Sequence, residues 1–201
     1  MSAARSQNGV SVCVSASCCG DVMSMPTRIE RPSTLATVDL GNGHAATIRT
    51  LQATDAAAER RFIEGLSPQT RRERFLTTMN GVGEGLLQLL MAEDAEGPLA
   101  VVATLPGERG LEIIGVARIA PSGGRAAECA ITVADAWQRR GLGHRLLEAL
   151  RSLAAKRGIR RLYSIDAVSN EHMREFARAV GAHARTDPDD ARQVIYELDV
   201  S

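Results

Sequence analysis

The chain has 201 residues, of which 44% are hydrophobic and 24% are charged. This length suits one domain with a substantial core and would be cramped for two, and the composition is that of an ordinary globular protein. Basic and acidic side chains are equal in number, so the formal net charge is zero. Without a bulk charge or an apolar run of membrane-spanning length, the chain is expected to bind neither nucleic acid nor a membrane.

Residues 1–43 are rich in Ser, Gly and Thr and show no sustained periodicity. We predict that they form a disordered leader, followed by one folded domain over residues 44–201. Three of the four cysteines, Cys13, Cys18 and Cys19, fall in this leader, and their spacing without a nearby histidine fits no familiar zinc pattern. We therefore expect free cysteines, no metal ion and a reducing, cytoplasmic environment.

Capping residues and periodicity define the first elements of the domain. Residues 46–51 alternate between apolar and polar side chains, which predicts a strand. Thr54 is the expected N-cap of a helix that ends near Gly65. Ser67 and Pro68 are typical of the cap and the first position of a second helix.

Apolar runs separated by Gly and Pro mark the remaining elements. In chain order we expect a helix at 85–92, strands at 99–104, 111–119 and 126–133, a helix at 141–157, a strand at 160–166, a helix at 170–180, and strands at 182–185 and 193–200. This order predicts an α/β layered domain with a mixed sheet.

The strand at 126–133 is joined to the following helix by a segment that contains Gln138-Arg139-Arg140-Gly141-Leu142-Gly143. Its glycines let the backbone approach a ligand closely. The first helical turn presents unpaired N–H groups at the positive end of the helix dipole. Together with three arginines between positions 139 and 145, these features predict a site for a phosphate or a pyrophosphate.

Two common phosphate-binding motifs do not fit this segment. A P-loop requires Lys after its last glycine, where this chain has His144. A dinucleotide-binding fingerprint requires a third glycine, where this chain has Leu146. The Trp-Gln-x-x-Gly-x-Gly pattern instead resembles motif A of the GNAT superfamily of acetyltransferases.

The order of elements over residues 46–200 is also similar to the GNAT fold, an α/β (α+β) fold with a mixed, mostly antiparallel central sheet flanked by helices. The resemblance implies acetyl-CoA as co-substrate. In that family the strand before the loop pairs with pantetheine, the loop amides hold the pyrophosphate, and an Asn of the last helix touches the coenzyme. The corresponding coenzyme-binding residues here are Ile131, Thr132, Val133, Gln138, Arg139, Arg140, Gly141, Leu142, Gly143, His144, Arg145 and Asn170.

Residues 66–75 and 114–118 resemble the GNAT domain of bacterial protein-lysine acetyltransferases, although Arg72 stands where that group has an aromatic residue. This narrower resemblance implies a protein lysine ε-amine as acceptor. Two alternatives stay open: a small amine such as a polyamine or an antibiotic as the acceptor, and a non-catalytic acyl-CoA-binding module. The oligomeric state is open as well, with a homodimer as one candidate.

Acetyl transfer requires a general base, because an alkylammonium with a pKa of about 10.4 must lose a proton before it attacks a thioester. Glu128, on the strand that leads into the loop, is the candidate base, and the resemblance supports this role. Strand alternation places Glu128 on the face opposite Cys129 and Ile131. A backbone N–H near Ile131 or Thr132 is the candidate donor to the oxyanion.

The group that protonates the departing thiolate is less clearly marked. Many GNAT enzymes have a tyrosine seven residues after the Asn, and that position is Ala177 here. His172 and Tyr163 are the candidate substitutes, with a purely structural role as the alternative for each.

Overall fold

The structure is a computed structural model that describes residues 33–75, 82–92, 99–108 and 110–200. Most of the predicted leader, including Cys13, Cys18 and Cys19, lies outside these residues.

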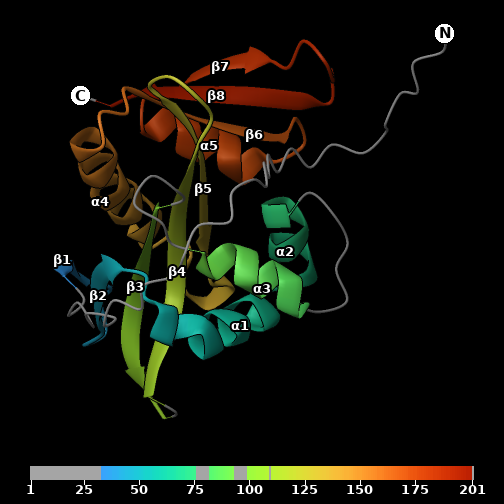
Figure 1. The fold of residues 1–201 in the computed structure, drawn as a ribbon. Coiled ribbons are helices and arrows are strands. Elements are labelled where there is room, and N and C mark those ends of the chain that lie inside the picture. Colours follow the sequence, from blue (N-terminus) through green and yellow to red (C-terminus); the bar gives the residue numbers. More distant parts are fainter. Residues whose placement is uncertain (1–32, 76–81, 93–98, 109, 201) are drawn as a thin grey trace, which may run out of the picture. The chain divides into compact units, whose positions relative to one another are not determined.

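Eight strands form one mixed sheet in the order β1-β2-β3-β4-β5-β6-β8-β7 (Figure 1). Neighbouring strands are antiparallel except β5 and β6, which are parallel. The predicted mixed and mostly antiparallel sheet is therefore confirmed. The strands are β1 (Thr34–Asp39), β2 (Ala45–Thr50), β3 (Leu99–Gly107), β4 (Gly110–Pro121), β5 (Ala126–Val133), β6 (Arg161–Ala167), β7 (His183–Thr186) and β8 (Gln193–Asp199).

Helices cover both faces of this sheet. One face carries α1 (Ala56–Gly65), α2 (Pro68–Phe75) and α3 (Glu84–Met91), and the opposite face carries α4 (Leu142–Lys156) and α5 (Glu171–Ala179) (Figure 1). Two short 3-10 turns, Ala53–Asp55 and Asp135–Trp137, precede α1 and α4. The predicted positions of these helices agree with the structure to within one or two residues.

Strand alternation builds a separate apolar core on each face. Val101 of β3 packs in the same cluster as Leu146 of α4, whereas its neighbour Val102 packs in the cluster of Ile63 of α1. All four side chains are at most 2% exposed. Burying a side chain of this size stabilises the fold by about 1.5–3 kcal/mol, so both helical layers are held firmly to the sheet.

The first strand begins earlier than the sequence predicts. β1 lies inside the segment 1–43, so the predicted disordered leader is wrong for residues 34–39. β1 pairs with β2 through a tight turn in which Gly41, Asn42 and Gly43 all have positive φ. Most of its side chains are exposed or half-buried, which explains why no clear apolar alternation marks the strand.

The start of α1 also differs from the prediction, because Thr54 does not cap it. Asp55 instead accepts a hydrogen bond from the Gln52 backbone N–H at 2.9 Å. The Asp55 carboxylate also forms a bidentate ion pair with Arg49 of β2 at 2.7 and 2.8 Å. The helix start is therefore fixed to the sheet by a buried tertiary contact.

β5 and β6 separate after a short stretch of pairing. Only three residue pairs join them, Ala126–Arg161, Ala127–Leu162 and Glu128–Tyr163. On its other edge β5 stays paired with β4 as far as Val133. The edge of β5 that faces β6 is consequently left without a strand partner from Cys129 to Val133 in this part of the structure.

Candidate active site

The separated ends of β5 and β6 border a cavity of about 550 Å³ that is also lined by α2, α4 and α5. Arg140 and Arg145 do not line it. They line a second groove, of about 820 Å³, between β1 and α4, and Gly141 borders both hollows. The predicted site residues that line the cavity are Glu128, Ile131, Thr132, Val133, Gln138, Arg139, Gly141, Leu142, Gly143, His144 and Asn170.

The loop before α4 has the backbone geometry of an anion site. Gly141 precedes the helix in the left-handed region, with φ 77°, and no side chain caps the first turn. Arg139 also has a positive φ of 58°, which is uncommon for a residue with a Cβ. A Cβ added at Gly143 would lie 3.3 Å from the Phe176 ring. The first turn of this 15-residue helix thus borders the cavity, and no side chain caps its N–H groups.

The three arginines of this region have different surroundings. Arg139 lies on the rim of the cavity, where its Nη2 is 2.8 Å from Nε2 of His172. Arg140 stacks over the Trp137 ring at 4.8 Å, and Arg145 forms an exposed ion pair within α4. Positive charge therefore continues from the cavity into the neighbouring groove.

Asn170 fixes the turn between β6 and α5. Its side chain accepts a hydrogen bond from the Met173 backbone N–H at 3.0 Å and donates one to Asp166 at 2.8 Å. Burial raises the pKa of Asp166 and the negative charge of Glu73 adds to this, although the bond from Asn170 works in the opposite direction. Glu73 of α2 and Asp166 of β6 therefore bring acidic charge to the same cavity.

Glu128 and Tyr163 meet at the point where the strands separate. They form a residue pair of the parallel ladder, and such pairs project from the same face of a sheet. Glu128 is exposed to the cavity and Tyr163 is half-buried. Cys129 points the other way, into the core beneath α4, so the predicted alternation is confirmed.

Several other groups of the cavity have little capacity for proton transfer or nucleophilic attack. Ala177, at the position of the family's tyrosine, is 2% exposed and has no hydroxyl. Burial raises the pKa of the Cys129 thiol to about 12, so this thiol is protonated at neutral pH.

Among the described residues no three His, Cys, Asp or Glu side chains are grouped as metal ligands. None of the described helices has the length and apolarity needed to cross a bilayer.

A cross-link between the loop and α2 was not foreseen from the sequence. Asp135 accepts hydrogen bonds from the Ser67 backbone N–H at 2.9 Å, and from the Ser67 and Thr70 hydroxyls at 2.7 Å each. Ser67 caps α2 as predicted, because its Oγ accepts a bond from the Thr70 N–H at 3.1 Å. Gln138 also reaches Thr70, at 3.4 Å. The anion loop and α2 are therefore one connected unit.

A buried ionic group beside the cavity is a second feature that sequence reasoning missed. Glu59 of α1, 2% exposed, pairs with Arg118 of β4 at 2.5 Å. Arg118 also donates to the Leu90 carbonyl at 2.5 Å. Arg74 of α2 lies against this pair and lines the cavity as well. The sequence of α2 is polar on all sides and gave no sign that Arg74, unlike Arg72, lines a cavity.

Comparison with known proteins gives consistent results. Residues 61–182 match the model of the acetyltransferase (GNAT) family. An acetyltransferase of Pseudomonas aeruginosa is 36% identical over 184 residues, which cover 88% of this chain and 99% of that protein. The GNAT domain of S. lividans PAT has a TM-score of 0.74 and 25% identity, covering 82% of this chain and 96% of that one. A cAMP-binding acyltransferase from Mycobacterium smegmatis has a TM-score of 0.56 and 25% identity, covering 85% of this chain and 48% of that one.

Proposed function

Because the chain belongs to the GNAT family and is an N-acetyltransferase with the GNAT fold, we propose that it transfers the acetyl group of acetyl-CoA to the ε-amine of a protein lysine, with Glu128 as general base. The observation that carries this proposal is the gap between β5 and β6. Its cavity connects the uncapped start of α4 to Glu128 and Tyr163.

Enzymes of this family use acetyl-CoA as co-substrate, and the cavity suits its parts. The open edge of β5, from Cys129 to Val133, offers backbone N–H and C=O groups to the amides of pantetheine. The first turn of α4 offers N–H groups to the pyrophosphate. Arg140 and Arg145 are our candidates for binding the coenzyme phosphate that is not part of the pyrophosphate. Their groove shares Gly141 with the cavity.

The proposed chemistry is direct attack. The Glu128 carboxylate takes one proton from the acceptor ammonium, and the amine lone pair then forms the N–C bond to the thioester carbon. A backbone N–H near Ile131 or Thr132 is our candidate donor to the oxyanion. As the C–S bond breaks, the Tyr163 hydroxyl is the candidate donor of a proton to the thiolate, and the second proton of the nitrogen then returns to the Tyr163 oxygen, which restores the hydroxyl.

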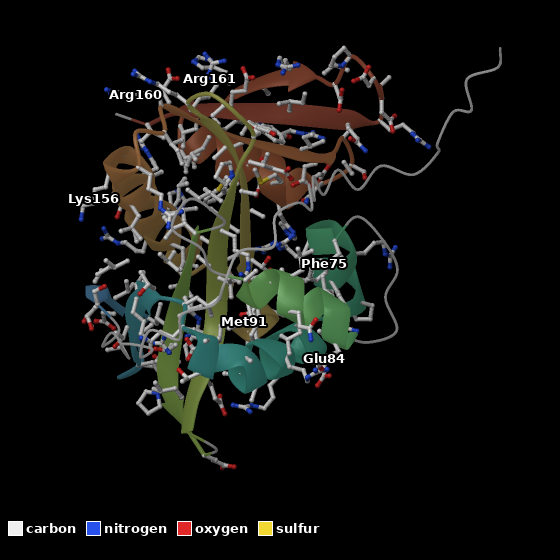
Figure 2. The ribbon with its side chains drawn as sticks, viewed as in Figure 1. Phe75, Glu84, Met91, Lys156, Arg160 and Arg161 are labelled. Carbon is white, nitrogen blue, oxygen red and sulfur yellow. The ribbon has the colours of Figure 1, made fainter. Side chains whose placement is uncertain are left out.

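A protein lysine is favoured as acceptor by the similarity to the GNAT domain of S. lividans PAT, a protein acetyltransferase. The acidic side chains Glu73 and Asp166 at the cavity suit a cationic amine of either kind. A polyamine or another small amine is therefore the second candidate acceptor. The only lysine of the sequence, Lys156, projects outward from the exposed end of α4 (Figure 2), so it is the candidate lysine for self-acetylation.

The test combines binding with turnover. Acetyl-CoA should raise the melting temperature, because a ligand that binds only the native state stabilises it. Release of the free coenzyme thiol is then followed with two probes, Nα-acetyl-lysine amide and spermidine. Turnover of the lysine probe supports the proposal, and turnover of spermidine alone replaces it with a small-molecule acceptor. Stabilisation without turnover of either probe would identify a non-catalytic acyl-CoA-binding module, and a lack of stabilisation would overturn the coenzyme assignment.

A further inference from the structure

Arg74 carries a guanidinium that finds no acceptor among the described residues. It lies one residue before the end of α2, and its guanidinium stacks over the ring of Phe75 at 4.9 Å. Phe75 is the last residue of that helix (Figure 2). No carboxylate or carbonyl of the described part of the chain accepts a hydrogen bond from it, in contrast to Arg49 and Arg118. A guanidinium has five donors and stays charged at neutral pH, so its positive charge is left to act on the cavity.

Arg74 separates the reaction cavity from the buried ion pair. It lines the large cavity on one side, and on the other a small one of about 10 Å³ that Glu59 and Arg118 also line. Two carboxylates act on the charge of Arg74, Glu59 and Glu128. Glu59 is already bound by Arg118, whereas Glu128 lines the large cavity together with Arg74.

The charged and titratable groups around Arg74 come from every neighbouring element. Burial, followed by the like charge of Arg118, lowers the pKa of Arg74 to about 10, while nearby carboxylates and a thiol oppose this shift. The groups are Arg118 on β4, Glu59 on α1, Glu128 and Cys129 on β5, Glu73 on α2, and Tyr163 and Asp166 across the cavity on β6.

Building on the proposed function, we propose that Arg74 activates the acceptor: its unpaired charge beside Glu128 lowers the pKa of the bound amine, so that the amine gives up its proton near neutral pH. A like charge disfavours the ammonium form of a neighbouring amine. A lysine amine is activated in this way in other enzymes that place a second cation beside it.

The cavity then has a gradient of charge along the path of the acceptor. Glu73 and Asp166 attract the cationic form of the amine. Next to Glu128 the guanidinium of Arg74 disfavours that same form. The proton that leaves the ammonium nitrogen goes to the Glu128 carboxylate, which becomes a carboxylic acid, and the neutral amine is left free to attack.

The experiment compares Arg74→Met, which removes the charge, with Arg74→Lys, which keeps it. Arg72→Met is the matched control, because Arg72 is exposed on the same helix and lines none of the cavities described here. The pH dependence of kcat is measured for Nα-acetyl-lysine amide and for its 4-thia analogue, whose side-chain amine is less basic. Melting temperatures confirm that each variant is folded.

We expect the acid limb of the kcat profile to move to higher pH by about one unit in Arg74→Met, and to stay in place in Arg74→Lys and Arg72→Met. At neutral pH the loss in Arg74→Met should be several-fold greater for the lysine probe than for the thia analogue. If the acid limb of the kcat profile does not move in Arg74→Met, or if kcat falls equally for the two probes, this inference is overturned while the proposed function stands. A wild-type protein that turns over neither probe overturns both.

Discussion

Glu128 of β5 and Tyr163 of β6 are the last residue pair of the parallel ladder, and the two strands part immediately beyond them. Both side chains line the cavity from the same face of the sheet. The proposed base and the proposed proton donor therefore lie side by side where the two strands separate. The first two predictions concern this pair.

Replacing Glu128 with Gln keeps the size of the side chain and removes the proton acceptor. We expect kcat to fall by roughly 10²–10⁴-fold, the usual contribution of a general base. The rise in melting temperature caused by acetyl-CoA should match that of the wild type, because the loop before α4 is unchanged. Equal turnover of variant and wild type at every pH would rule Glu128 out as the base.

Replacing Tyr163 with Phe removes only the hydroxyl. If that hydroxyl protonates the departing thiolate, we expect kcat to drop by roughly 10²-fold with little change in the KM for acetyl-CoA. Steady-state thiol release measures both constants. A normal kcat would assign the proton to another donor, and His172→Gln, tested in parallel, would then be expected to show the loss.

Gly141 and Gly158 provide a matched pair at the two ends of α4, with φ of 77° and 73°. Alanine at either position is strained by about 1–2 kcal/mol, because a Cβ clashes in the left-handed region. Urea unfolding should show a similar loss of stability for both variants. Only Gly141→Ala should also weaken stabilisation by acetyl-CoA, since Gly141 lines the cavity. Equal stabilisation of the two variants would show that the loop does not bind the coenzyme.

We predict that the free energy of unfolding decreases at acidic pH because Asp135 becomes protonated there. Burial alone would raise its pKa, but hydrogen bonds from the Ser67 N–H and from the Thr70 and Ser67 hydroxyls outweigh burial and lower it below the ordinary value of 3.8. A carboxyl whose pKa is lower in the folded state stabilises the fold above the ordinary pKa, and the contribution is lost as pH falls through the folded value.

The corresponding variant is Asp135→Asn, compared with the wild type by urea unfolding at several pH values. The wild type should be more stable at neutral pH, and the two stabilities should converge below pH 3.8. Curves that stay parallel over this range would mean that the Asp135 charge does not hold α2 to the loop.

The sequence predicts those parts of the fold that local rules control. Ser67 caps α2, and Gly65 and Gly158 lie at helix ends, as their residue types indicate. β1 was missed because its mostly exposed side chains carry little apolar pattern. Thr54 was wrong as a cap because Asp55 occupies that position, where it accepts from the Gln52 N–H and pairs with Arg49 of the neighbouring strand.

The residues of the candidate site likewise fall into two groups, those that local rules place and those that only tertiary packing places. The loop residues were predictable because glycine spacing and helix polarity are local, and most of them line one cavity. The hydrogen bonds between Asp135 and Ser67 span 68 positions of the chain, so no local pattern reports them. Arg74 was equally hidden, because only the packing of α2 against β5 decides which of its arginines faces inward.

The short β5–β6 ladder has a further consequence for how the protein opens. In the described residues only three residue pairs connect the five strands β1 to β5 with the three strands β6, β8 and β7, so the sheet is weakest where β5 meets β6. The C-terminal strands should exchange their amide hydrogens by a partial opening that leaves the N-terminal strands protected. A ligand that hydrogen-bonds to the free edges of both β5 and β6 would stabilise their junction. A higher concentration of that ligand would then make separation of the C-terminal strands from the rest of the sheet less frequent.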